Sequence, residues 1–479
     1  MKNVEKCDKS NMLKNNIIIR KFKNIFLELN KLSTAKILVM GFLVMIFLGA
    51  CVLKTDISLV ENKTINFLDA IFIATSAVCV TGLSTVVISE TFSLFGKCVL
   101  LFLIQIGAIG FMTFVCLGFE ILGKKLSLKS KMLFEESFDL VTDDIKKLVK
   151  RILIFVFGTE ITGAVLLSFS FVPQYGKVGI FYSLFHSISA FCNAGFDLFG
   201  STSLLIYQTD WYVNVVLMIL IVLGGIGYLV VFDILKKIKY TIINKHSFKH
   251  IFRKFNLHTK IVLVTTFSLI IFGTLIILIL ESLNPNTLAN KEMNEKLLIS
   301  LFQSISARTA GFNTLNMSEC LQSTNLLYIV LMFIGGSPAS TAGGIKTVTF
   351  AILVLTVVSM LKKKKNISIY NRKIAEDNLR KAIVVFFLAI STIFITSLIF
   401  MTYEKCTFLE SIFEIVSAFG TVGSTLGVTN RLTNIGKILL IILMFIGRLG
   451  IVTVIMSTIQ ESHLDLKTYE YPEERMILG

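Results

Sequence analysis

Charged side chains are scarce in this sequence of 479 residues: 16% are Asp, Glu, Lys or Arg, whereas 54% are hydrophobic and the mean hydropathy is +0.78. Soluble globular domains carry about 25% charged residues, so this composition excludes that class. Crossing a bilayer needs about 20 apolar residues, and eight stretches qualify. They cover residues 37–53, 98–119, 152–172, 212–234, 261–280, 324–360, 382–402 and 435–458. The sequence therefore predicts a membrane protein, and the sixth stretch is too long to be one unbroken helix.

Other features are missing as well. The eight cysteines show no C-x-x-C spacing, and several lie inside apolar stretches, so we interpret them as small core residues. No A-x-A-like site follows the N-terminal tail, so a cleaved signal peptide is not expected. No glycine cluster has the soluble strand-turn-helix context of a nucleotide-binding loop. We therefore expect no enzyme activity and no cofactor in this chain.

Basic residues are unevenly placed. The 47 Lys and Arg residues exceed the 31 Asp and Glu residues, and most of them fall in residues 1–36, 121–151, 235–260 and 361–381. Basic loops stay on the cytoplasmic side of a membrane. The pattern predicts that both termini and the three basic loops are cytoplasmic in a multi-pass protein. It favours the lipid bilayer over nucleic acid as the partner of this charge.

A short pattern, Ser-Ala followed by a glycine, occurs four times, in residues 76–83, 189–196, 306–312 and 417–424. The last glycines of the four copies are separated by about 112–116 residues, which leaves room for two membrane helices and their loops. The third copy has one residue fewer before its glycine. Each copy ends an apolar segment of about 13 residues, which is too short to span and is typical of a re-entrant helix. These segments are 67–79, 180–191, 296–307 and 408–419.

The repeats predict an all-α fold of four parallel M1-P-M2 hairpins, with eight transmembrane helices and four re-entrant pore helices around a pseudo-fourfold pore. The predicted boundaries are a basic tail at 1–36, repeats at 37–120, 151–236, 258–361 and 380–460, and a C-terminal tail at 461–479. Parallel repeats differ from the inverted repeats common in secondary transporters. They favour a channel-like ring.

The repeated motifs suit a cation filter made of backbone carbonyls. Such a filter needs unusual backbone dihedrals, which glycine adopts at little steric cost. No carboxylate lies within the four motifs, which argues against a calcium-type filter. The helix C-terminus before each motif carries partial negative charge, which favours a cation. The predicted filter residues are Val80, Thr81, Gly82, Asn193, Ala194, Gly195, Thr309, Ala310, Gly311, Thr421, Val422 and Gly423.

The third returning segment departs from the others, which are expected to continue as apolar helices. Proline and four glycines disfavour a helix here, and irregular backbone at membrane depth is tolerated only where it lines water or is buried. We expect a loop across the pore, although a kinked packing helix is the alternative. The candidate gate residues are Gly335, Gly336, Ser337, Pro338, Ala339, Ser340, Thr341, Ala342, Gly343, Gly344, Lys346 and Arg448. The last two are cations at membrane depth, which can form an electrostatic barrier or hold the loop.

Five further polar residues have structural interpretations. We expect Arg308 to bind loop carbonyls or an acid such as Glu414 behind the filter, and Glu160 to pair with another helix. Asp69 and Glu410 lie near the starts of their half-helices, where acids act as caps. His186 is interpreted as a packed or water-bonded histidine.

Together these segments resemble the Trk/Ktr/HKT superfamily of potassium transporters, and most closely its bacterial Ktr-type membrane subunit. The resemblance covers residues 37–479 and rests on the four filter segments, the loop 335–346 and Gly447-Arg448; the C-terminal Tyr471-Pro472-Glu473-Glu474 and Ile477-Leu478-Gly479 add less specific similarity. The tail 1–36 has no counterpart in it.

The resemblance implies potassium uptake across the bacterial cytoplasmic membrane, with potassium as the transported ion and sodium as an activator. It implies a homodimer on a cytoplasmic ring of nucleotide-binding regulatory (KtrA-like) subunits. It also implies that the loop 335–346 is an intramembrane gate that Arg448 contacts. Two alternatives stay open: a sodium-permeable or sodium-coupled cation transporter, and a secondary transporter of an organic solute.

Overall fold

The computed structural model describes residues 33–110, 113, 145–200, 202–244, 251–364 and 366–458. Nearly all of the predicted tail 1–36, most of the basic loop 121–151 and the whole C-terminal tail 461–479 lie outside these residues. The described chain is helical. Its strands are β1 (Ser368–Ile369) and β2 (Arg372–Lys373), an antiparallel pair in which Ser368 faces Lys373.

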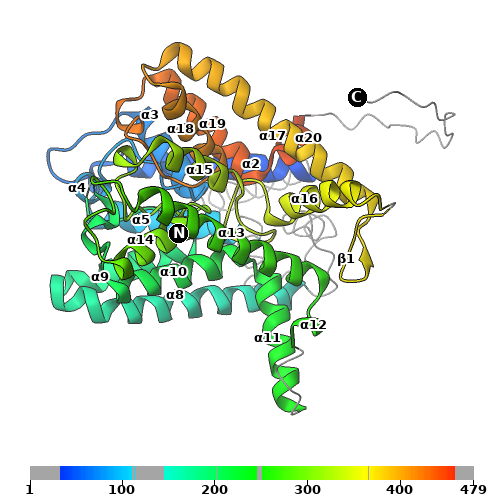
Figure 1. Cartoon of the computed structure of the whole chain (residues 1–479). Helices are drawn as coiled ribbons and strands as arrows, with labels where there is room; N and C mark the ends of the chain where they lie inside the picture. Colours follow the sequence, from blue (N-terminus) through cyan, green and yellow to red (C-terminus); the bar gives the residue numbers. More distant parts are fainter. Residues whose placement is uncertain are drawn as a thin grey trace, which may run out of the picture.

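Each repeat begins with a long apolar helix: α2 (Thr34–Leu53), α8 (Ile145–Tyr175), α13 (Leu257–Glu281) and α17 (Glu376–Tyr403). By length and composition, all four can cross a membrane. Large apolar side chains such as Phe387 point outward and are exposed, as expected on a surface that faces lipid. Helices α8 and α17 lie on opposite outer sides of the molecule (Figure 1).

A half-length helix follows in each repeat, as the sequence predicted: α3 (Phe67–Val78), α9 (Val178–Phe191), α14 (Met293–Ser306) and α18 (Phe408–Gly420). Capping boxes start two of them, Glu292 with Glu295 at α14 and Thr407 with Glu410 at α18. The capping role predicted for Glu410 is thus confirmed. Asp69 lies in the first turn of α3 and forms an ion pair with Lys437 at 2.7 Å, which joins repeat 1 to repeat 4.

The returning helices are α5 (Leu94–Ile109), α10 (Trp211–Ile226), α15 (Gln322–Phe333) and α19 (Asn434–Leu449). The prediction that repeats 2 and 4 return as unbroken apolar helices is wrong. The chain turns by 100° between α10 and α11 (Tyr228–Ile243) and again between α19 and α20 (Ile451–Thr458). Gly227 and Gly450 stand at these turns with φ of +97° and +86°, where glycine is favoured, and α11 projects away from the body (Figure 1).

The third returning segment is broken as predicted. Helix α15 ends at Phe333, and α16 (Thr347–Leu361) begins only after an irregular stretch of residues 334–346. The remaining short elements lie in the connections. They are α4 (Ile88–Thr91), α12 (Ile251–Lys254), and the 3-10 turns η1 (Asp56–Ser58), η2 (Ser203–Tyr207), η4 (Met317–Glu319) and η5 (Thr429–Arg431).

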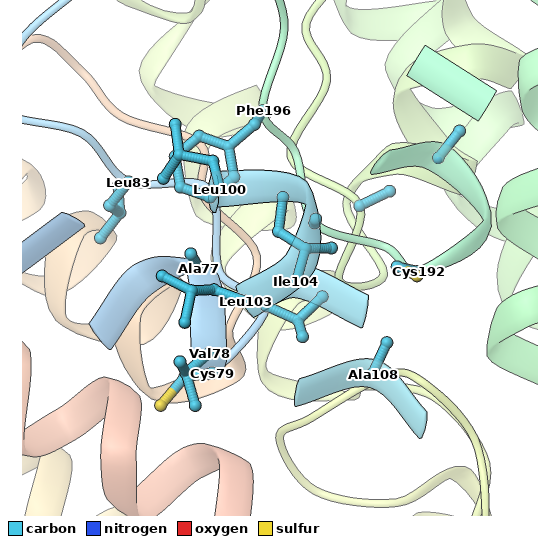
Figure 2. Close-up of a cluster of buried hydrophobic side chains, with 14 of the residues drawn as sticks. Ala77, Val78, Cys79, Leu83, Leu100, Leu103, Ile104, Ala108, Cys192 and Phe196 are labelled. Atoms are coloured by element: carbon cyan, nitrogen blue, oxygen red, sulfur yellow. The ribbon is translucent and has the colours of Figure 1, made fainter. Parts of the chain in front are cut away.

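The four repeats form a closed ring. Each returning helix packs against the half-length helix of the next repeat: α5 on α9, α10 on α14, α15 on α18, and α19 on α3. Figure 2 shows one such junction, where Leu103, Ile104 and Ala108 of α5 lie between the end of α3 and Cys192 at the end of α9. The ring brings the C-terminal ends of the four half-length helices, and hence the four glycine motifs, to one place.

Candidate functional site

The four glycine motifs share one backbone conformation. In each, the glycine and the residue two positions earlier have positive φ, while the residue between them does not. The earlier residues are Val80, Asn193, Thr309 and Thr421, with φ of +58°, +59°, +74° and +51°; the glycines are Gly82, Gly195, Gly311 and Gly423, with φ of +94°, +68°, +72° and +97°. Non-glycine residues rarely adopt positive φ, so its repetition at equivalent places marks a strained, specialised segment.

The third motif aligns with the others at its glycine. Because Thr309 and Gly311 repeat the dihedral pattern, the missing residue lies before them, where α14 already ends at Ser306. Arg308 therefore occupies the position of Cys79, Cys192 and Gly420 in the other repeats. This fixes the register of the third segment.

The four glycines are in contact around the ring. A Cβ on any of them would collide with a backbone carbonyl oxygen of the next repeat: 2.5 Å from Ala194 for Gly82, 2.8 Å from Ala310 for Gly195, 2.0 Å from Val422 for Gly311, and 2.2 Å from Thr81 for Gly423. The fourth contact returns to the first repeat. The predicted filter residues are thus brought together, and only glycine fits at these four positions.

A serine anchors each motif to the half-helix that precedes it. The hydroxyls of Ser189, Ser306 and Ser417 donate to the carbonyls of Phe196, Phe312 and Ser424 at 2.7, 2.5 and 2.6 Å. In repeat 1, the amide of Gly82 donates to the hydroxyl of Ser76 at 3.0 Å. The sequence showed these serines as part of the motif but gave them no role; their fourfold repetition was the available signal.

The stretch 334–346 lies against repeat 2. The amides of Ser337 and Thr341 donate to the carbonyls of Gly225 and Gly224 at 3.0 and 3.3 Å, and the amide of Tyr228 donates to the carbonyl of Ala339 at 2.9 Å. The first two contacts use carbonyls at the end of α10 and the third uses the amide at the start of α11, groups that the break between these two helices leaves without helical partners. The loop therefore packs onto the bend at Gly227.

The loop also touches repeat 4 and the filter. A Cβ on Gly343 would lie 2.2 Å from the hydroxyl of Thr421, so the loop passes directly against the fourth filter segment. Arg448 donates to the carbonyls of Thr341 and Gly107 and, at 3.2 Å, to that of Ala108. Lys346 donates to the carbonyl of Ala342 at 2.7 Å within the loop. Both cations thus bind backbone carbonyls, and Arg448 ties the loop to repeats 1 and 4.

The other polar residues have these partners. Glu414 accepts hydrogen bonds from Thr425, Leu426 and Thr429, and none of its hydrogen bonds within the described residues comes from Arg308. The buried Arg308 side chain lines a small cavity together with Ile221, Gly225 and Gly336, and its Nε lacks a hydrogen-bond partner in the described part of the chain. The expected hydrogen bond to Glu414 is therefore wrong, and none to a loop carbonyl occurs among the described residues either. His186 is packed, as predicted: it stacks on Phe199 at 4.3 Å and contacts the Tyr182 carbonyl at 2.7 Å.

Two carboxyls outside the spanning helices have shifted pKa values. Asp197 follows the second filter segment, and burial raises its pKa to about 6, against a hydrogen bond from the amide of Phe199 that opposes the shift. At the start of α18, the hydrogen bond from the Thr407 amide lowers the pKa of Glu410, helped by Arg431. The raised pKa brings the charge change of Asp197 closer to neutral pH than that of an ordinary aspartate.

The fold and site define a class: an all-α membrane protein with four M1-P-M2 repeats, whose glycine motifs meet in a closed ring. The sequence matches the family model TrkH, described as "Cation transport protein", over residues 22–465. The chain belongs to this family of cation transporters, which are not enzymes.

Curated relatives are similar over almost their whole length. The chain is 39% identical to the Ktr system potassium uptake protein B of Bacillus subtilis, covering 94% of this chain and 97% of that protein. It is 38% identical to the potassium/sodium uptake protein NtpJ of Enterococcus hirae, covering 94% and 98%. The crystal structure of the potassium transporter TrkH from Vibrio parahaemolyticus has the same fold, with a TM-score of 0.69 and 19% identity over 89% of this chain and 85% of that one.

Proposed function

We propose that this protein takes up potassium through a channel-like pore whose selectivity filter is the ring of four glycine motifs. The observation that carries the proposal is the closed contact of Gly82, Gly195, Gly311 and Gly423, each facing a carbonyl oxygen of the next repeat. Relatives named as potassium uptake proteins support the choice of ion.

The chemistry of the motifs suits a monovalent cation. Backbone carbonyls can replace the water shell of potassium without the full negative charges that hold a divalent ion. The predicted filter residues that flank each glycine supply these carbonyls, and the serine anchors hold them in place. An inside-negative membrane potential then drives entry by about 2.3 kcal/mol per charge per 100 mV.

The loop 335–346 acts as the gate of this pore. Its contact with Thr421 places it against the fourth filter segment, and Lys346 adds a cation to its base. Arg448 holds it closed by donating to Thr341 and to repeat 1. Opening would require these hydrogen bonds to break together, so that the loop moves as a unit.

The orientation of the protein in its membrane is inferred from the basic loops, and its partners are inferred from the relatives. Both termini face the cytoplasm by the positive-inside bias, and the protein lies in the bacterial cytoplasmic membrane as a homodimer. Relatives named as parts of a "Ktr system" support a multi-component assembly, here with a nucleotide-binding regulatory ring on the cytoplasmic side. In this proposal, sodium activates the uptake of potassium.

A second candidate is combined potassium and sodium uptake. The name of the Enterococcus hirae relative favours it, since that protein is called a potassium/sodium uptake protein. The two candidates share one pore and differ in selectivity alone.

Uptake of rubidium and sodium into proteoliposomes under an imposed inside-negative potential tests the proposal. Potential-driven rubidium uptake that excess potassium blocks and excess sodium does not would support the potassium filter. Equal block by sodium would favour the second candidate. Uptake competed by an organic solute, or no cation uptake by a folded variant that lacks residues 337–342, would refute the proposal.

A further inference from the structure

Glu160 is a buried acid in the middle of the spanning helix α8, and the function proposed above leaves it without a role. Its side chain is 2% exposed. Gln105 of α5 donates its amide to both carboxyl oxygens at 3.0 Å, and the thiol of Cys192 donates to Oε1 at 3.5 Å. None of the ion pairs among the described residues includes Glu160. All of its hydrogen-bond donors here are therefore neutral.

The cluster of Gln105, Glu160 and Cys192 lies directly behind the second filter segment. Cys192 is the C-cap of α9, and the next residue, Asn193, is the first of that segment with positive φ. The hydroxyl of Ser187 on α9 donates to the backbone carbonyl of Glu160 at 2.6 Å, so Glu160 lies beside the last two turns of this half-length helix. The Cys192 thiol also lies 3.7 Å from Oε1 of Gln105, and Figure 2 shows Cys192 beside α5, the helix that carries Gln105. The cluster thus joins repeats 1 and 2 at the back of the filter.

The third repeat shows what packing alone requires at this position. Ser304 donates to the carbonyl of Ile270 at 2.8 Å, just as Ser187 donates to that of Glu160. Three residues further on, Gly273 and Gly163 approach these same serines, with a built Cβ 2.4 Å from the hydroxyl in both repeats. Ile270 is therefore the counterpart of Glu160, and a buried isoleucine fills the place. The fold does not need an acid there.

A carboxyl group buried inside a membrane protein is either protonated or needs a positive charge that compensates its own. We propose that Glu160 sets the affinity of the pore for its cation: its carboxylate makes the second filter segment more attractive to monovalent cations, with the permeating cation as its counter-charge. This inference rests on the proposed filter. Glu160 does not touch the ion. Its negative charge lowers the electrostatic potential at the second filter segment, which begins at Asn193, and its hydrogen bond with Cys192 holds it next to that segment.

The inference is tested by removing the negative charge of Glu160 and then restoring it on Gln105. Glu160→Gln keeps the size of the side chain and one of its two acceptor oxygens but removes the charge. Its KM for rubidium is expected to rise about tenfold, with Vmax changed less than about twofold. The double variant Glu160→Gln with Gln105→Glu restores the charge on the other side of the same hydrogen-bonded pair, and its KM is expected to return to within about threefold of the wild type.

Glu281→Gln is the matched control. Glu281 is also a fully buried acid with neutral donors, namely Asn284, Thr287 and the amide of Leu321, but it lies at the far end of α13. Its KM is expected to match the wild type.

An unchanged KM in Glu160→Gln, or an equal rise in Glu281→Gln, would overturn the inference. So would a double variant with the KM of the single one. If Glu160→Gln does not fold, Glu160→Ile, which places the residue of repeat 3 at this position, takes its place, and an unchanged KM there would overturn the inference. Failure of the wild type to take up rubidium under the potential would instead refute the proposed function.

Discussion

Replacing Gly311 with serine probes the filter most directly. Gly311 has φ of +72°, which costs a non-glycine residue about 1–2 kcal/mol. Its new Cβ would lie 2.0 Å from the carbonyl oxygen of Val422 and 3.2 Å from the Cα of Gly423. Ordinary contacts need about 3.5 Å, so the third and fourth segments must separate by more than about 1 Å. Such a shift widens a carbonyl cage, which then distinguishes potassium less well from sodium, the smaller and more strongly hydrated ion.

The expected result is a loss of preference for potassium over sodium of about tenfold, which corresponds to about 1.4 kcal/mol. The measurement is rubidium uptake into proteoliposomes at increasing sodium concentrations, with folding checked by size-exclusion chromatography. Gly427→Ser is the matched control: Gly427 has a similar φ of +91°, but a Cβ there meets nothing within 4 Å. Its selectivity is expected to stay that of the wild type. Unchanged ion preference in a folded Gly311→Ser protein would refute the assignment of the filter.

Three further changes have defined outcomes. Deleting residues 337–342 removes the segment that packs on Gly224 and Gly225, so rubidium flux without any partner should rise severalfold; a lower flux in folded protein would contradict the gate. Arg448→Gln removes a charge-assisted contact between the loop and repeat 1, worth about 1.5–3 kcal/mol, so basal flux should rise, and an unchanged flux would show that Arg448 does not hold the loop. Asp197 has a pKa raised to about 6, so it gains negative charge as the external pH rises from about 5 to 7, and uptake at low potassium should increase over that range. The variant Asp197→Asn should lack this increase; a wild-type pH profile in that variant would show that another group is responsible.

The sequence was sufficient where the determinants are local. Half-length apolar segments, repeated glycines and a proline-containing break each restrict the backbone on their own, and the half-helices, the ring of motifs and the break after Phe333 all occur. The ion-binding role of the filter residues stays a prediction. The bends at Gly227 and Gly450 were missed because glycine in an apolar helix is equally typical of close packing. Gly224 and Gly447, three residues earlier, do serve that purpose, with a built Cβ 1.9 Å from a carbonyl of the adjacent half-helix.

Contacts between distant segments were harder to predict. The sequence predicts that Arg308 binds loop carbonyls or an acid such as Glu414, but Glu414 accepts its hydrogen bonds from the loop that follows its own filter segment. The sequence spacing does not show whether Arg308 or the following loop donates to Glu414, because either set of donors would provide hydrogen bonds to this buried acid. The partners of Glu160 were likewise invisible, since Gln105 is 55 residues away on another repeat.

The fourfold likeness of the repeats extends from the helices to the backbone of the four glycine motifs, where it is strictest. The positive-φ pairs, the glycine contacts and the serine anchors recur in every repeat, because four equivalent carbonyl sets need four equivalent backbones. Immediately before them the equivalence ends: the corresponding positions hold Cys79, Cys192, Arg308 and Gly420. The loop 335–346 likewise comes from repeat 3 alone, and it forms hydrogen bonds with repeats 2 and 4. The ion cage proposed here is symmetric but its surround is not, so we expect that it can be opened or tuned from one side without a change in its carbonyl geometry. We therefore expect substitutions at the glycines to change which ion passes, and substitutions behind them to change how tightly and how fast it passes.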